Sequence, residues 1–209
     1  MMTDFENSLP ADLRRVVAFH GHYCPGIMWG YIASKAGLAR LGASRAEDEE
    51  LIAIVENDSC AADAVQVITG CTFGKGNFFF RDWGKHVYTF ALRSPEDPEA
   101  PFPQDPEGPS GRGAGREAGR AVRVSRRAEV PDAPDDESRE AKVLRMLRAD
   151  PEDLFTIEET TIDLPDVAHI HDSVLCARCG EPVMTTRTRE VDGKPVCLGC
   201  VNAKGNGSR

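Results

Sequence analysis

Apolar positions along the first ninety residues follow two different periods. Where they recur three or four residues apart they lie on one side of a helix, and this spacing predicts helices over 12–19, 25–41 and 60–68. Continuous apolar runs bounded by turn residues are typical of buried strands, and they predict strands over 50–56, 78–80 and 86–92. Residues 1–93 are therefore expected to form an α+β domain.

Capping residues support these boundaries. Pro25 suits the first turn of the second helix, where no backbone donor is lost, and Gly42 follows its last apolar position. Gly70 ends the third helix, and the oxygens of residues 57–59 precede it as capping groups. Residues 82–84 suit a turn between the last two strands.

The rest of the chain changes in composition. Residues 94–135 are rich in Pro, Gly and charge and are expected to be a linker or insertion, in which only Ala121 to Ser125 alternates as a short strand would. Residues 136–170 predict a helix, with Val143, Leu144 and Leu147 at helical spacing, and then an extended segment. Residues 171–209 hold four cysteines and form a separate module.

The composition is that of a globular protein, with 41% hydrophobic residues in 209. The net charge of −9 disfavours a general electrostatic grip on nucleic acid, although a local basic patch stays open. The first residues contain no apolar signal segment, and no apolar run is long enough to span a membrane. We therefore expect a cytoplasmic protein whose seven cysteines are reduced and available to metal.

Two CxxC pairs near the end of the chain predict a zinc finger. Seventeen residues separate them, and the four thiolates that can enclose zinc are Cys176, Cys179, Cys197 and Cys200. The intervening residues suit a hairpin that turns at Asp192-Gly193. Two redox pairs are the alternative, but neither pair sits at a strand-to-helix step. Four protein ligands leave no open position, so the zinc is expected to be structural.

A second group of potential ligands occurs in the first domain. His20, His22 and Cys24 fall within five residues, and Cys24 and Cys60 each lie near the start of a predicted helix. A helix N-terminus stabilises a thiolate, which makes these cysteines better ligands and nucleophiles. Each residue alone could be ordinary packing, and Cys71 in particular could be a small buried apolar side chain.

Three stretches stand out together: HGHYCPG at 20–26, ENDSCAADAVQVITGCTFGKGN at 56–77, and the terminal CxxC pairs. They resemble the FmdE family, named after one of the subunits of molybdenum formylmethanofuran dehydrogenase, closely over residues 10–93 and loosely beyond. The resemblance implies an FmdE-like α+β core that dimerises, followed by a small treble-clef or zinc-ribbon finger. It also implies a metal-binding cleft with His20, His22, Cys24, Cys60 and Cys71, near Asp58, Asp63, Gln66 and Lys75.

Three hypotheses of function follow. The first is a zinc-containing accessory or metal-handling protein tied to formylmethanofuran dehydrogenase or molybdoenzyme metabolism, with a second metal ion of open identity in the core and a molybdoenzyme as partner. The second is a metal-dependent enzyme with an open His/Cys site, for which Cys60 and Lys75 are the catalytic candidates. The third is a regulatory protein whose finger binds nucleic acid or RNA polymerase through a basic face at Arg187 and Arg189; these arginines are otherwise a solvated surface.

The aromatic run at 78–80 bears on the expected homodimer. Side chains alternate between the two faces of a strand, so three consecutive phenylalanines cannot all enter one core. An outward Phe79 would then need a partner surface.

Overall fold

The computed structural model describes residues 3–93, 118–129 and 136–203, which divide between two compact units at residue 168. Each unit is considered by itself. Most of the predicted linker, residues 94–117, lies outside the described residues. Within the described ranges no helix is both long and apolar enough to cross a bilayer.

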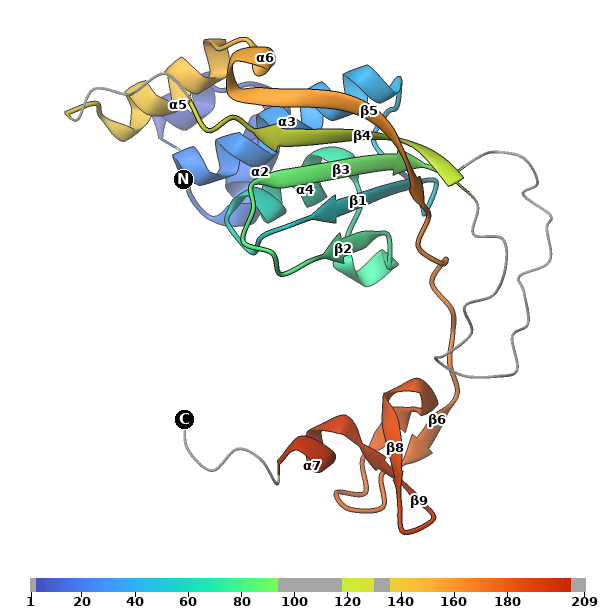
Figure 1. The fold of residues 1–209 in the computed structure, drawn as a ribbon. Coiled ribbons are helices and arrows are strands. Elements are labelled where there is room, and N and C mark those ends of the chain that lie inside the picture. The colour runs from blue at the N-terminus through green and yellow to red at the C-terminus, as the bar shows by residue number, and fades with distance from the viewer. Residues whose placement is uncertain (1–2, 94–117, 130–135, 204–209) are drawn as a thin grey trace. The chain divides into compact units, whose positions relative to one another are not determined.

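The first unit is a five-stranded sheet with helices packed on it (Figure 1). The strand order is β2-β1-β3-β4-β5, and only β1 and β2 run parallel. The strands are β1 (Leu51–Val55), β2 (Phe78–Phe80), β3 (Val87–Leu92), β4 (Ala118–Arg126) and β5 (Phe155–Asp163). The helices are α1 (Asp4–Ser8), α2 (Ala11–His20), α3 (Pro25–Leu41), α4 (Ala61–Thr69), the 3-10 turn η1 (Phe73–Lys75), α5 (Arg139–Arg148) and α6 (Pro151–Leu154).

The three predicted helices of the first ninety residues are confirmed as α2, α3 and α4. Pro25 is the first residue of α3, and Gly42 follows the helix in the left-handed conformation with φ 68°. Gly70 caps α4 in the same way. Gly30 lets α3 and α4 approach closely, because a Cβ there would overlap the carbonyl oxygen of Ala61. This close approach fixes the start of α4 against the start of α3.

Strand β1 is buried on both faces of the sheet. Its residues Leu51, Ala53 and Val55 join the core beneath the helices, with Tyr88, Phe90 and Phe155 among its largest buried members. Ile52 and Ile54 point the other way, into a second cluster with Ala91, Ala121 and Leu164. This explains why the run reads as continuously apolar instead of alternating.

The structure places two strands of the sheet beyond the predicted core boundary at residue 93. Strand β4 contains the short strand predicted at 121–125 and lies between β3 and β5, where Val122 pairs with Phe90 and with Glu159. A segment interpreted mainly as linker is thus an internal strand, because its pairing partners come from distant parts of the chain. The predicted helix over 136–150 is confirmed as α5, with Val143 and Met146 buried.

The reasoning that linked Phe79 to a dimer does not hold. Phe79 is half-buried and packs against the second cluster, beside Ile52 and Ile54 of its own chain. It therefore has an intramolecular partner on the face opposite Phe78. The homodimer stays a prediction without this support.

The second unit is built from two small hairpins and a short helix. Its elements are β6 (Ser173–Leu175), β7 (Pro182–Met184), the 3-10 turn η2 (Thr185–Arg187), β8 (Thr188–Val191), β9 (Lys194–Cys197) and α7 (Leu198–Asn202). The predicted hairpin turn is confirmed: Asp192 and Gly193 both have positive φ, at 52° and 71°, as a type I′ turn between β8 and β9 requires.

Candidate metal centres

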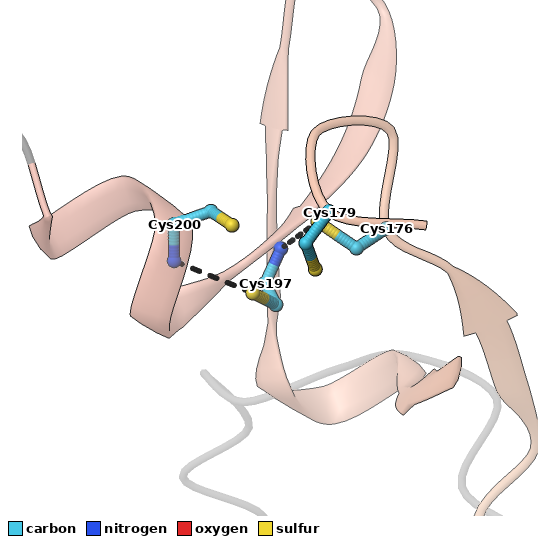
Figure 2. Close-up of side chains that lie close together, drawn as sticks. All are labelled: Cys176, Cys179, Cys197 and Cys200. Atoms are coloured by element: carbon cyan, nitrogen blue, oxygen red, sulfur yellow. Dashed lines mark hydrogen bonds between the residues drawn. The ribbon is translucent and has the colours of Figure 1, made fainter. Parts of the chain in front are cut away.

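The four cysteines of the second unit converge on one point (Figure 2). Their sulfur atoms all lie within 4.8 Å of one another. Cys176 and Cys179 come from the turn between β6 and β7, whereas Cys197 ends β9 and Cys200 lies in the first turn of α7. This donor set fits zinc, which four thiolates hold in a tetrahedron. The predicted zinc site of the finger is thereby confirmed in its residues.

Backbone amides hold two of these sulfurs. The amides of Cys197 and Cys200 donate to the sulfurs of Cys176 and Cys197, each at 3.3 Å. Backbone donors, those at Cys179 and Cys197 foremost, lower the pKa of Cys176 to about 6. Neighbouring thiols, Cys197 first and then Cys179, instead raise the pKa of Cys200 to about 12. Four thiolates this close repel one another, and a divalent cation removes that conflict.

The core holds a second cluster at the loop between α2 and α3. One ligand atom each from His20, His22 and Cys24 lies within 4.8 Å of the others. Nε2 of His20 is 3.9 Å from the sulfur of Cys24, and the rings of His20 and His22 are 4.6 Å apart between centroids. Gly21, with φ 96°, ends α2 and turns the chain between the two histidines. The predicted convergence of this motif is what the structure has.

Asp63 fixes the orientation of His20. Its Oδ2 atom is 2.7 Å from Nδ1 of His20, so that Nε2 faces Cys24. A carboxylate on the outer ring nitrogen is the usual support of a metal-binding histidine, since it sets the tautomer and raises the basicity of the other nitrogen. Asp63 lies in the first turn of α4.

Cys60 approaches the same cluster from α4, across Gly26. A Cβ on Gly26 would lie 3.2 Å from the sulfur of Cys60, 3.4 Å from that of Cys24 and 2.9 Å from the Cβ of Cys60. The two thiols therefore meet at a place on α3 that has no side chain. Sequence reasoning missed this role of Gly26, for which a glycine two residues after a candidate ligand is the only signal.

The two cysteines cap the helices as predicted, but a lowered thiol pKa does not follow at Cys60. Cys24 precedes α3 and Cys60 precedes α4 as their N-cap residues. Burial first, and then the neighbouring thiol of Cys24, raise the pKa of Cys60. In the metal-free chain these two effects outweigh the helix terminus, and a bound cation would reverse them.

Four other residues predicted at the cleft lie elsewhere. Cys71 is fully buried, donates to the carbonyl of Leu51 at 3.2 Å, and has a pKa raised to about 11 by burial. Lys75, the second catalytic candidate, donates to two backbone carbonyls of the loop before β1. The third and fourth are Gln66, which accepts from the amide of Phe73, and Asp58, which is exposed. Cys71 and Lys75 therefore act in packing and loop anchoring.

Family models match both units. Residues 19–156 match the model described as FmdE, molybdenum formylmethanofuran dehydrogenase operon, and residues 172–203 match the prokaryotic dksA/traR C4-type zinc finger. The first match spans well over half of the chain. The protein is an α+β chain with a C4 zinc finger, and it belongs to the FmdE family.

Two similar proteins extend this comparison. A protein of Archaeoglobus fulgidus with the name "Probable S-adenosyl-L-methionine-binding protein" is 30% identical over 203 residues, which are 95% of this chain and 54% of that protein. The chain thus spans about half the length of this curated relative. The crystal structure of an FmdE-like protein of tungsten formylmethanofuran dehydrogenase, from Syntrophus aciditrophicus, shares the fold. Its TM-score is 0.60 at 21% identity, and the match covers 93% of this chain and 92% of that one.

Proposed function

We propose that this chain is a metal-handling accessory protein tied to formylmethanofuran dehydrogenase or molybdoenzyme metabolism. Its finger zinc would be structural, and its core site would hold a second, exchangeable ion. The family description supports the metabolic setting. The observation that carries the metal role is the convergence of Cys24, Cys60 and the Asp63-oriented His20 at one point.

The ligands of the core site suit exchange better than catalysis. Two sulfurs and two imidazoles make four candidate ligands, and a full set of four favours a carrier over an enzyme with an open position. His22 is exposed, whereas His20 and Cys24 are half-buried. An exposed ligand can leave the ion first and admit an acceptor. Soft thiolates and imidazoles suit Zn²⁺ and similar transition metals, and not Mg²⁺ or Ca²⁺.

The alternatives have less support. The catalytic hypothesis loses Lys75, whose amine is bound to the carbonyls of Glu47 and Asp48. The regulatory hypothesis rests on Arg187 and Arg189, each of which donates to the carbonyl of the residue before it. Neither arrangement points to a substrate or to nucleic acid.

Zinc exchange tests the proposal. In a chain loaded with two zinc ions, a chromophoric chelator should remove one equivalent well before the other. His22→Ala should speed the loss of the first equivalent by at least about tenfold, since it removes the exposed ligand. His171→Ala is the control, because His171 is also exposed but lies outside both clusters. Equal rates for both ions in all three proteins would refute the carrier proposal.

Gly26→Ala should weaken the core site although it favours the helix. Alanine stabilises a helix interior by about 1 kcal/mol relative to glycine. The added methyl would however lie 2.9 Å from the Cβ of Cys60 and push its thiol away. We expect zinc affinity of the core to fall by about tenfold or more, with the finger unchanged. Gly74→Ala, which has open space around it, is the control; equal affinity in both variants would show that Gly26 has no such role.

A further inference from the structure

An arginine outside the ion pairs stands over a tryptophan at the end of the sheet. Arg126, the last residue of β4, is exposed, and its guanidinium carbon lies 4.3 Å from the ring centroid of Trp29 on α3. Trp29 is itself held edge-on by Phe155 at 5.6 Å. Among the ion pairs of the described residues, none includes Arg126. Its donors are thus positioned by stacking and left available.

His86 adds a second polar group beside the same tryptophan. The rings of His86 and Trp29 are 6.5 Å apart, and Nδ1 of His86 is 3.4 Å from the hydroxyl of Tyr88. Burial first, and then the charge of Arg126, lower the pKa of His86. At neutral pH the imidazole is therefore uncharged and can donate or accept a hydrogen bond.

This group lies at the same end of the sheet as the core cluster. Arg126 follows Ser125, which pairs with Val87, and Tyr88 pairs with Val55 at the end of β1. The side chain of Asn57 donates to the carbonyl of Lys85, next to His86. Asn57 also accepts from the amide and hydroxyl of Ser59, which directly precedes Cys60. On α3, Trp29 lies one turn beyond Cys24, the N-cap. A continuous chain of contacts therefore joins the two groups.

We propose that Arg126 and His86 form a subsite for the oxyanion group, carboxylate or phosphate, of a small molecule that reaches the core site. A guanidinium offers a planar fork of donors that matches an oxyanion, and stacking on Trp29 holds it in place at little entropic cost. The neutral imidazole of His86 supplies a further donor at the side. The subsite is defined by protein residues alone, but its place as the anchor for a ligand of the core metal rests on the proposed function.

The subsite can be observed through its own residues. The chain has two tryptophans, so Trp83→Phe leaves Trp29 as the only indole reporter and also removes the second cation-stacked indole, near Arg81 and Lys85. Inorganic phosphate and acetate are titrated separately into this variant, with Trp29 fluorescence and the NMR titration of His86 as readouts. Saturable quenching is expected, together with a rise in the pKa of His86, because a bound anion offsets the charge of Arg126.

Arg126→Gln should weaken the response at least about tenfold, as expected for loss of a charged hydrogen-bond partner, and should by itself raise the pKa of His86. Arg123→Gln, on the same strand, should bind as the parent does. A preference between phosphate and acetate identifies which oxyanion the subsite takes. An unchanged response in Arg126→Gln, or no saturation by either anion, would overturn the proposal.

Both forms of the protein are titrated, with and without zinc. Binding to the zinc-free chain at Arg126 would uphold the subsite even if the core holds no metal. Loss of anion binding with metal content intact would remove the subsite and leave the proposed function standing.

Discussion

Cys197→Ser will release the finger zinc and unfold residues 173–203. Cys197 has two roles, since its sulfur belongs to the four-cysteine cluster and also accepts from the amide of Cys200 as the cap of α7. The two-stranded hairpins around it are too small to be stable alone. Structural zinc supplies about 10–16 kcal/mol of apparent binding free energy in peptides of this kind, which here is folding free energy.

The measurement is zinc per chain together with amide hydrogen exchange. Amides of β8 and β9 should lose protection, whereas those of β1 and β3 should keep it because the first unit has its own core. Cys179→Ser should behave in the same way, as a second ligand at a more exposed position. Full protection of β8 and β9 in a zinc-free variant would mean that the metal is not structural.

Cys60→Ser should abolish tight binding of the core metal and barely change the stability of the core. Cys60 is half-buried at the edge of the core, and a hydroxyl is a poor ligand for zinc. We expect affinity to fall on the order of a hundredfold or more, with one zinc retained in the finger. The melting temperature should move by less than about 3 °C, since about 1 kcal/mol shifts a chain of this size by 2–4 °C.

Cys71→Ser is the matched control with the opposite expectation. Cys71 has no exposed surface and lies away from both clusters, so its replacement should leave metal content unchanged. Placing a hydroxyl in that apolar site should destabilise the core by about 1–3 kcal/mol. If Cys71→Ser lost metal and Cys60→Ser did not, the assignment of ligands would be reversed.

The elements that the sequence predicted best are those set by local physics. Helix α3 begins at Pro25 and ends before Gly42, as residue type alone indicated, and the turn at Asp192-Gly193 follows from the same local rules. Strand β4 was predicted only as a short strand within a linker, because its stability comes from β3 and β5, which are separate segments of the chain. No local pattern carries that information.

The core site was predictable in its motif and not in its membership. His20, His22 and Cys24 converge because only a short loop separates them. Whether Cys60 or Cys71 joins them depends on how closely α4 packs on α3, which Gly30 and Gly26 decide. Cys71 comes after α4, at its far end, and is buried near Leu51 instead.

Metal stoichiometry combined with X-ray absorption tests the central claim, that one chain carries two chemically different metal sites, most directly. Zinc-loaded protein should contain two ions per chain, with a mean first shell in which sulfur outnumbers nitrogen. In Cys60→Ser the count should fall to one, and the remaining ion should show four sulfur neighbours at about 2.3 Å and no nitrogen. A single zinc per wild-type chain, already surrounded by four sulfurs, would contradict the core site.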